Sequence, residues 1–516
     1  MTSNWTNGYQ NEVNYTYGYY RDLSPNYQRF CLLLNGIACP ETNENHNHCE
    51  LGFGQGISVN VHAASHGGKF FGTDFNPSHA AHAQELARKS KIITNFYDDS
   101  FEELLNRNNF PQFNSISLHG IWSWISHENQ SIILKFIRKY LKPNGVVYIS
   151  YNCMTGWASN MPVRELFYSH FKYNSTSNNP LEKVQAALDF SENLLSQDSV
   201  FIKANPNTLN KVKELKSQNP NYLIHEYLNQ DWQCFSFQQV VRIFDDIKLN
   251  FAGSTNLGSL LPNITFTDEQ QAFLNNIDHP IVKEQCKDYF TNSQFRKDLF
   301  VRGPNNLTPL EQKEALKDIS FILLVKPKFF PKNINGILGS FSLIEEIYKP
   351  LGDYLEKNDY KPQTIRELEK ALPQLNYEKI LNAFVILCHY DLAQPCLSEI
   401  KDERIQQCQN LNLHLIKQAF FHQNYQVLIS PVTGIGIPVD HFTQLFYYAY
   451  FVEGLKTTKQ FANLVQKVLD DLGWSVIDEN KELVSDKQKS LKIIEDRASH
   501  FIRADFLKIA KELKLF

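Results

Sequence analysis

A glycine-rich turn is the feature whose residue types and spacing most directly indicate chemistry. Gly52, Gly54 and Gly56 follow the short apolar run that ends at Leu51, and Glu50 stands just before them. Glycine lets the backbone adopt positive φ and pass close to a ligand. The N–H groups that open the following helix then point at that ligand. The pattern predicts a small-molecule site, and a tight turn without a ligand is the structural alternative.

Acidic residues after the next two predicted strands narrow the class of ligand. The G-x-G-x-G spacing differs from the G-x-G-x-x-G of dinucleotide binders, which holds a pyrophosphate. Asp74 closes the second predicted strand, 22 residues after Gly52, where a carboxylate accepts hydrogen bonds from ribose hydroxyls. Asp98 and Asp99 follow the third strand, where an acidic group typically meets adenine. The structural alternatives are a helix cap for Asp74 and a solvated loop for Asp98 and Asp99.

Strands and helices alternate over the part of the chain that contains these residues. This alternation predicts an α/β fold with a doubly wound parallel sheet. Ligands bind beyond the carboxyl ends of such strands. His119 ends the fourth predicted strand, and Tyr151 and Asn152 follow the fifth, so all three are candidates for the site. The predicted strands are 49–51, 69–74, 92–97, 115–119 and 146–150, and the predicted helices include 57–64, 78–89 and 129–141.

The five strands leave an apolar sheet edge that needs a partner. The runs 298–302 and 320–326 are the nearest strand candidates, so we predict that they supply the last two strands. Residues 296–330 would then complete the first domain after a long helical insertion. The region after that reads as three helices, with a winged-helix-like arrangement, and then as further helices. The predicted units are residues 1–157, 158–295, 335–400 and 401–516.

Composition excludes several classes of function. Hydrophobic residues make up 42% and charged residues 21% of the 516 residues, which is usual for a globular protein. The net charge of −4 argues against a nucleic-acid partner that is bound by bulk electrostatics. The nine cysteines form no C-x-x-C pair, so we expect reduced thiols in a cytoplasmic protein.

Membrane, secretion and metal signals are weak. No run of about 18 apolar residues is present, so we expect no membrane span. The first ten residues lack a basic segment followed by an apolar one, so we expect no secretory signal. The segment His46-Asn47-His48-Cys49 has no second ligand cluster at zinc-finger spacing, so we expect no metal.

Several blocks of the sequence resemble one enzyme family. The glycine-rich turn, the acid after Gly72 and the block His119–Trp124 resemble the class I S-adenosylmethionine-dependent methyltransferases. Further blocks at 225–228 and 430–438 resemble, more narrowly, the bacterial protein-lysine methyltransferases of the rickettsial outer-membrane-protein type, which carry a methyltransferase regulatory domain. The N-terminal lead, Tyr15-Thr16-Tyr17-Gly18, departs from the Tyr-Pro-Ser pattern of that family.

The resemblance implies a cofactor, a substrate and a set of site residues. The cofactor is S-adenosylmethionine, and the substrate is the lysine ε-amine of a protein. An apolar channel with aromatic walls would lower the pKa of that amine and orient it. The implied cofactor-binding residues are Glu50, Gly52, Gly54, Gly56, Asp74, Asp98, Asp99 and His119. The candidates for catalysis are His119, Tyr151, Asn152 and Trp122, and the other aromatic candidates for the channel are Tyr19, Tyr20, Trp124 and Trp157.

Other functions and assemblies stay open at this point. A methyltransferase of this fold can act on a small molecule or an RNA base, and the domain can also serve as a non-catalytic cofactor sensor. The helical insertion leaves the sheet at its ligand-binding rim, so we expect it to flank the site in a broad cleft that it shares with the C-terminal helices. A homodimer formed through the insertion is implied by the resemblance, as is a regulatory or dimer-forming role for His225, Glu226 and Tyr227. The sequence itself favours a helix-packing role for these three residues.

Overall fold

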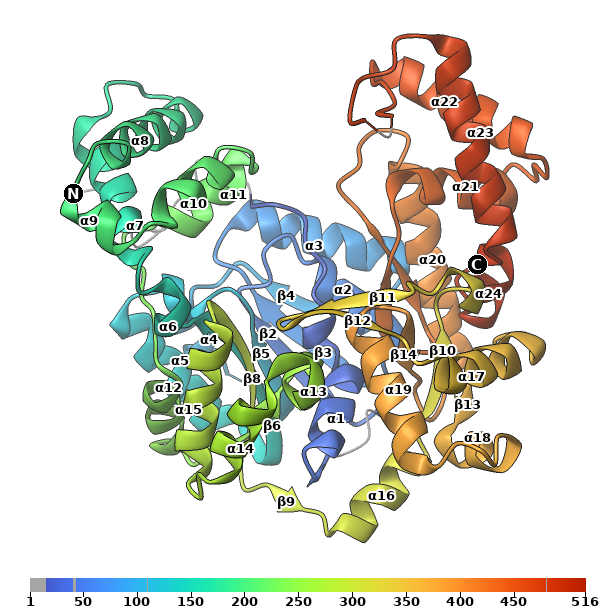
Figure 1. Ribbon diagram of the computed structural model, residues 1–516, viewed down its shortest axis with the longest axis horizontal. Helices are drawn as coiled ribbons and strands as arrows, with labels where there is room; N and C mark the ends of the chain where they lie inside the picture. Colours follow the sequence, from blue (N-terminus) through green and yellow to red (C-terminus); the bar gives the residue numbers. More distant parts are fainter. Residues whose placement is uncertain (1–14, 40–42, 109, 479) are drawn as a thin grey trace.

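A seven-stranded sheet forms the centre of the protein, whose computed structural model describes residues 15–39, 43–108, 110–478 and 480–516. The strand order is β4-β3-β2-β5-β6-β8-β7 (Figure 1). Strands β2 to β6 pair in parallel, and β8 pairs antiparallel with both β6 and β7. The doubly wound α/β sheet that the sequence predicts is therefore confirmed. The strands are β2 (Asn47–Leu51), β3 (Lys69–Thr73), β4 (Asn95–Tyr97), β5 (Phe113–Leu118), β6 (Leu141–Asn152), β7 (Asn250–Ser254) and β8 (Phe295–Val301).

Helices cover both faces of this sheet because successive strand residues point to opposite sides. On β6, Val146 and Tyr148 enter one core, while Val147, Ile149 and Tyr151 enter the other. The first core is covered by α1 (Pro25–Leu34), α2 (Ile57–Ser65) and α3 (Pro77–Ser90). The second is covered by α4 (Phe101–Asn106), α5 (His127–Tyr140) and α12 (Phe237–Asp245).

One predicted strand of the sheet is wrong. The run 298–302 does enter the sheet, as part of β8, but 320–326 does not. β10 (Ser320–Leu323) pairs instead with β13 (Gln363–Thr364) and β14 (Ala393–Pro395) in a separate three-stranded sheet. The seventh strand is β7, which lies inside the region that reads as a helical insertion. Its sequence, NFAGS, is short and weakly apolar, so its pairing is set by β8 rather than by a local signal.

The chain between β6 and β7 forms a lobe that stands above the sheet (Figure 1). We call this the insertion lobe, residues 161–227, and it has a hydrophobic core of its own. The core includes Phe167, Leu188, Val212 and Leu223, which are buried. The dimer that the resemblance implies for this region stays a prediction. The helices of the lobe are α7 (Met161–Ser169), α8 (Pro180–Leu195), α9 (Val200–Ala204), α10 (Thr208–Leu215) and α11 (Pro220–Tyr227).

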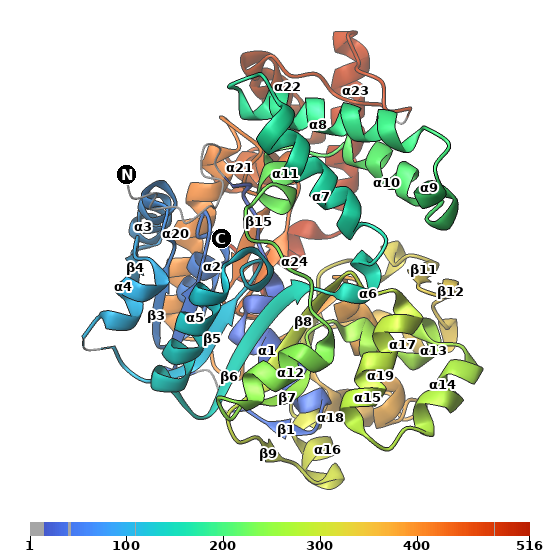
Figure 2. The same cartoon turned by 90° about the vertical axis from the view of Figure 1, so that its left-hand side faces the viewer.

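The C-terminal part is largely helical and packs on the first core (Figure 2). The three helices expected in 335–400 are present as α17 (Glu345–Lys357), α18 (Ile365–Ala371) and α19 (Tyr377–His389). The short strands β10, β13 and β14 lie beside them. The rest comprises α20 (Asp402–Gln418), β15 (Val427–Ser430), β16 (Ile435–Pro438), α21 (His441–Phe451), α22 (Thr458–Leu472), α23 (Lys487–Arg503) and α24 (Phe506–Glu512).

Membrane and secretion expectations meet the structure as follows. None of the helices within the described ranges combines the length and the apolar character that crossing a bilayer requires. The first ten residues, on which the expectation of no secretory signal depends, lie outside the described residues.

A buried ionic network holds β8 against the rest of the sheet. The Arg296 guanidinium lies 2.8 Å from Asp298 Oδ2 and 2.7 Å from Asp288 Oδ1, and it stacks 4.3 Å from the ring centre of Phe237. The Tyr151 hydroxyl donates to Asp298 Oδ2 at 2.8 Å. A charge that is this deeply buried needs such partners, because losing one of them leaves an uncompensated charge.

Arg296→Met should destabilise the protein by about 3–5 kcal/mol, because it leaves the Asp288 and Asp298 carboxylates buried without their cation. Urea denaturation followed by tryptophan fluorescence measures this change in the free energy of unfolding. Arg88→Met is the matched control, since Arg88 is exposed and pairs only with Glu85 on its own helix. Equal effects of the two substitutions would show that the network contributes no stability.

Candidate functional site

The glycine-rich turn between β2 and α2 has the left-handed backbone that its sequence predicts. Gly52, Gly54 and Gly56 have φ values of +71°, +56° and +73°. A Cβ on Gly52 would lie 2.2 Å from Ile121 Cδ1, and one on Gly56 would lie 2.3 Å from Ala83 Cβ. Gly52 and Gly54 line a cavity at the end of the strands, whereas Gly56 allows α2 to approach α3. The turn therefore serves both a ligand site and helix packing.

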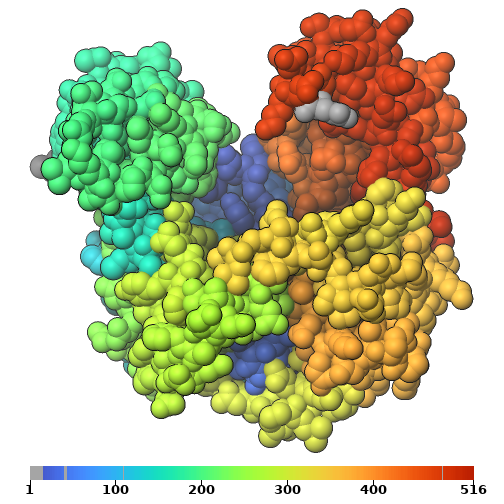
Figure 3. All heavy atoms as spheres, viewed as in Figure 1, coloured from blue at the N-terminus to red at the C-terminus, as the bar shows by residue number. Residues whose placement is uncertain are grey.

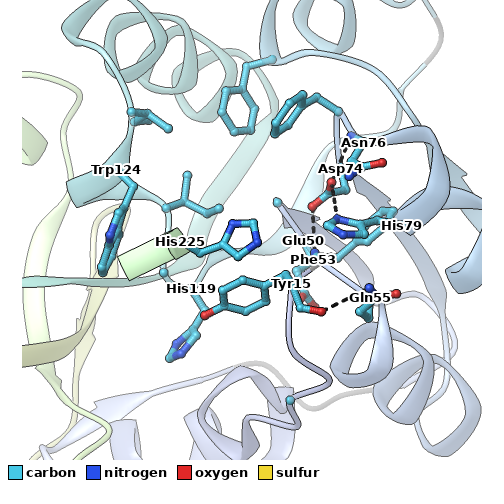
Figure 4. Close-up of a pocket in the computed structure, with 18 of the residues that line it drawn as sticks. Tyr15, Glu50, Phe53, Gln55, Asp74, Asn76, His79, His119, Trp124 and His225 are labelled. Atoms are coloured by element: carbon cyan, nitrogen blue, oxygen red, sulfur yellow. Dashed lines mark hydrogen bonds and ion pairs between the residues drawn. The ribbon is translucent and has the colours of Figure 1, made fainter. Parts of the chain in front are cut away.

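This cavity, the first cavity, lies at the carboxyl ends of the parallel strands, where open α/β sheets bind ligands (Figure 4). Trp124 and His119 lie on one side of it, and Asp74 and His79 lie on the opposite side. The main lining residues are Tyr15, Tyr20, Glu50, Gly52, Gly54, Asp74, Asp99, His119, Trp124 and His225.

Asp74 is held rigidly at the end of β3. Its Oδ2 accepts a hydrogen bond from the Gly54 N–H at 2.8 Å, and its Oδ1 accepts one from the Asn76 N–H at 3.1 Å. The His79 Nδ1 lies 3.1 Å from the same Oδ1. A carboxylate that is fixed in this way faces the cavity in one orientation, which suits the recognition of paired hydroxyl groups.

Glu50 has a carboxyl oxygen that accepts no hydrogen bond from the described residues. The residue is buried, and among the described residues its Oε2 has no hydrogen-bond partner. Burial, together with the negative charge of Asp74, raises the pKa of Glu50 to about 8. A ligand that donates a hydrogen bond or carries a positive charge would satisfy this atom.

The two acids after β4 differ in position. Asp99 lines the first cavity, and the Arg107 guanidinium donates to its Oδ1 at 2.8 Å. Asp98 is exposed and lines neither this cavity nor the second one described below. The prediction that both acids contact the ligand is therefore not supported for Asp98, since only one of two successive residues turns inward at the end of the strand.

His119 lies at the centre of the site as a neutral imidazole. Its Nδ1 is 2.8 Å from the Tyr148 hydroxyl, and its ring centre is 3.9 Å from that of Tyr20. Burial lowers the pKa of His119 to about 3. The ring therefore carries no charge near pH 7, and its conjugate acid is too strong for it to take a proton from an ammonium group.

Trp122 and Tyr151 do not lie in the site, which corrects the sequence-based assignment. Trp122 is fully buried with its ring centre 5.6 Å from that of Phe244, and Tyr151 is buried with its hydroxyl on Asp298. Both belong to the second core, because the strand alternation turns Tyr151 away from the cavity. That a residue lies near the end of a strand in the sequence does not show which face of the sheet its side chain occupies.

Asn152, by contrast, does face a cavity. Its backbone N–H donates to Ser123 Oγ at 2.8 Å, and its carbonyl accepts from the Phe235 N–H at 2.8 Å. These bonds fix the side chain, which is 1% exposed and whose Nδ2 has no hydrogen-bond partner among the described residues. Asn152 is therefore a positioned donor at the end of β6.

A second cavity adjoins the first and is larger, about 380 Å³ against about 130 Å³. The two share Tyr15, Tyr20, His119, Gly120 and Trp124, which we call the gateway. The insertion lobe forms most of the remaining wall, including residues that the sequence indicates only as helix-packing residues. The further lining residues include Asn152, Trp157, Arg164, Phe167, Lys211, Tyr222, Glu226, Tyr227 and Phe295.

The N-terminal segment, residues 15–20, ties this site to the C-terminal part of the chain. Tyr17 packs edge-on against both His82 and Tyr425. The His82 ring lies 2.6 Å from the carbonyl of Gln55, within the glycine-rich turn, and 2.7 Å from the Tyr425 hydroxyl. The C-terminal helices contribute no residue to either cavity, whose described lining ends at Phe295, so they support the site from outside.

Among the described residues, no group of three or more histidine, cysteine, aspartate or glutamate side chains is arranged to hold a metal ion. His46 and His48 both contact Ser115 Oγ, at 2.9 and 2.7 Å, and both are buried in the sheet. Their rings are packing residues of the first core.

Comparison with known proteins places the chain. Residues 49–149 match the family model of a methyltransferase domain, and residues 219–302 match that of a predicted methyltransferase regulatory domain. An uncharacterized protein of Synechocystis sp. is 34% identical over 504 residues, which cover 96% of this chain and 97% of that protein. An uncharacterized protein of Rickettsia prowazekii is 24% identical over 61% of this chain and 57% of its own length.

Solved structures show the same fold. The structure of PKMT2 from Rickettsia typhi in complex with AdoHcy superimposes with a TM-score of 0.69 at 18% identity, over 97% of this chain and 99% of that one. The same Rickettsia typhi protein in a second structure gives a TM-score of 0.65 at 19% identity, over 98% of this chain and 99% of that one.

The geometry fits the cofactor of that family. A class I methyltransferase sheet presents Gly52 and Gly54, the open carboxyl of Glu50 and the fixed carboxylate of Asp74 to one cavity at its rim. The methyltransferase domain and the regulatory domain occur together in this chain, and the Synechocystis relative aligns with it over nearly its whole length. The chain belongs to the S-adenosylmethionine-dependent methyltransferases that carry a methyltransferase regulatory domain.

Proposed function

We propose that this methyltransferase acts on lysine side chains of proteins. The observation that carries the proposal is the second cavity, which meets the cofactor side at the gateway and has walls rich in aromatic rings. An alkyl chain that ends in an amine fits such walls, because aromatic faces attract the cation and exclude water. The resemblance to protein-lysine methyltransferases points to the same substrate, and the solved neighbour is named PKMT2.

On the cofactor side, we assign a role to each lining group. Bound S-adenosylmethionine supplies a methyl group on a positively charged sulfur. Asp74 accepts hydrogen bonds from the ribose hydroxyls, and Gly52 and Gly54 allow the backbone to approach the ligand. Glu50 accepts from the ligand's amino group, which satisfies its open Oε2. Asp99 lies at the end of β4, on the side that we assign to adenine.

On the acceptor side, the gateway positions the amine. Tyr20 stacks on His119, and Trp124 donates its indole N–H to the backbone carbonyl of Glu226 at 3.1 Å. These rings separate the two cavities and limit water between them. Displacement at the methyl carbon requires an in-line approach, so the enzyme's contribution is orientation and the exclusion of water.

The surface above the site is consistent with a large substrate. Figure 3 shows that the molecule is hollowed between the insertion lobe and the C-terminal helices. A lysine on a folded protein needs an open approach of this kind, whereas a metabolite needs an enclosed pocket.

A small anionic acceptor is the second candidate, and one observation favours it. Arg164 and Lys211 both line the second cavity and could bind a carboxylate or phosphate. Arg164 is buried and already donates to the Asn229 carbonyl and to Glu165. Lys211 is more exposed, and its Nζ lies 3.5 Å from Glu214 Oε2.

Asp74→Ala should weaken the binding of S-adenosylhomocysteine by about 1.5–3 kcal/mol, as is typical when hydrogen bonds to a charged group are lost. Isothermal titration calorimetry measures the affinity. Asp98→Ala, which removes an exposed acid outside the cavity, is the control and should bind as the wild type does. If Asp74→Ala also binds with unchanged affinity, Asp74 has no role in the site.

Binding of S-adenosylhomocysteine should also depend on pH through Glu50. The free protein holds Glu50 with a pKa of about 8, and a cationic amino group favours the ionised form. Below pH 8 binding must therefore release a proton, and the affinity should fall by up to about tenfold per pH unit as the pH drops. Calorimetry between pH 6 and 8 measures this slope. Glu50→Gln should be flat over the same range, and an equal slope in the variant would assign the titration to a group other than Glu50.

Incubating the enzyme with methyl-labelled cofactor and a cell lysate tests the substrate class. We expect label in the protein fraction, and on lysine after hydrolysis to amino acids. Label only in small metabolites would favour the anionic acceptor, and label only in RNA would favour a nucleic-acid substrate. Tight cofactor binding without any labelled product would indicate a cofactor sensor.

A further inference from the structure

Among the described lining residues of the second cavity, Glu226 is the one that carries a carboxyl group. The residue lies on α11, where Leu223, Ile224 and Tyr227 are buried in the core of the insertion lobe. These side chains fix the rotation of the helix, so Glu226 is turned toward the cavity. The carboxyl is therefore placed by the packing of the lobe and not by a surface loop.

The Glu226 carboxyl has no partner among the residues that the structure describes. Among the described residues, no hydrogen-bond donor and no cation meets it, and burial alone raises the pKa of Glu226 to about 8. Arg164 and Lys211 line other parts of the same cavity and leave this pKa unaffected. Placing an unpaired carboxyl in an aromatic wall is costly unless a ligand satisfies it.

Glu226 lies beside the gateway. Its backbone carbonyl accepts from Trp124 Nε1, and Trp124 lines both cavities. Tyr20 also lines both cavities, the first with Glu50 and the second with Glu226. Burial raises the pKa of its hydroxyl, and the charges of the two carboxyls add to the rise. A group that reaches Glu226 through the second cavity is therefore next to the cofactor side.

A second open polar group lies in the same cavity. Asn152 Nδ2 is buried without a partner, on the β6 side of the cavity, and its backbone is fixed by Ser123 and Phe235. Glu226 offers an acceptor and Asn152 offers a donor. An ammonium group donates to the Glu226 carboxyl. The Asn152 amide can donate only to another atom of the substrate, because the amine lone pair must stay free to attack the methyl carbon.

We propose that Glu226 is a catalytic residue that binds the ammonium group of the acceptor and takes its proton. The inference rests on the proposed lysine substrate. One proton passes from nitrogen to a Glu226 oxygen, and the nitrogen lone pair then forms the N–C bond while the S–C bond breaks with its electron pair going to sulfur. The positive charge moves from sulfur to nitrogen, and the Glu226 proton leaves to solvent before the next cycle.

The tyrosine, cysteine and histidine side chains around Glu226 do not change their charge between pH 6 and 10, whereas Glu226 does. Burial raises the pKa values of the tyrosine and cysteine side chains there and lowers that of His119, so all of these groups stay neutral between pH 6 and 10. Arg164 and Lys211 are the arginine and the lysine of the described lining. The titratable groups that face the carboxyl are Tyr20, Tyr222, Tyr227, Cys234 and His119, together with these two cations.

Binding of n-butylamine, a lysine side chain without its backbone, to the complex with S-adenosylhomocysteine tests the site without turnover. Calorimetry should show binding to the wild type and at least about tenfold weaker binding to Glu226→Gln, as expected when a charged hydrogen bond is lost. Both proteins should bind S-adenosylhomocysteine equally, which shows that the variant is folded. Glu182→Gln, an exposed glutamate of the same lobe, is the control and should bind butylamine as the wild type does. Absent or unchanged butylamine binding would overturn the inference.

The pH profile of labelling gives an independent readout. For the wild type, kcat/KM for the labelling of lysate protein should rise with pH up to about pH 8. For Glu226→Gln, the pH at which kcat/KM rises should move toward the pKa of free lysine, about 10.4. Glu226→Asp should restore part of the wild-type profile. A variant profile that is lower but unshifted would make Glu226 structural. Absence of protein label from the wild type would instead remove the proposed function, which separates the two failures.

Discussion

The two-residue pleat of β6 determines what surrounds the site. Tyr148, Ser150 and Asn152 share one face, where Tyr148 meets the His119 ring, Ser150 Oγ accepts from the Gly120 N–H at 2.9 Å, and Asn152 faces the second cavity. The alternate residue Tyr151 faces the other core and joins the network of Arg296. Because β8 pairs with β6 along its last seven residues, the pleat is fixed up to the rim. The loop that carries His119 and Gly120 is thus positioned by a neighbouring strand.

Burial gives the site its electrostatic character. The same desolvation raises the pKa of Glu50 and of Glu226 and lowers that of His119, so these three side chains are mostly uncharged near pH 7. Each unpaired carboxyl lies on one side of the gateway. In the proposed reaction, a cationic ligand binds each of these carboxyls. Without the ligands, both acids stay buried and uncharged, which costs the folded protein free energy.

The sequence was sufficient where the signal is local. The glycine turn, Asp74 and the first five strands follow from spacing and periodicity within short windows. β7 was missed because five weakly apolar residues pair only through a partner more than forty residues away, while the stronger run at 320–323 belongs to another sheet. Trp122 and Tyr151 were assigned by nearness to a strand end, which does not reveal the face. The position of Glu226 at the cavity depends on how the helices of the insertion lobe pack, and a short window of sequence does not predict that packing.

The separate origin of the two cavities has an evolutionary consequence. The sheet and its loops form most of the first cavity. A lobe with its own hydrophobic core, inserted between β6 and β7, forms most of the second cavity, which we propose as the acceptor side. Acceptor preference can therefore diverge by drift within one inserted segment while the donor chemistry is inherited intact. Grafting residues 161–227 between homologues would exchange specificity as a unit.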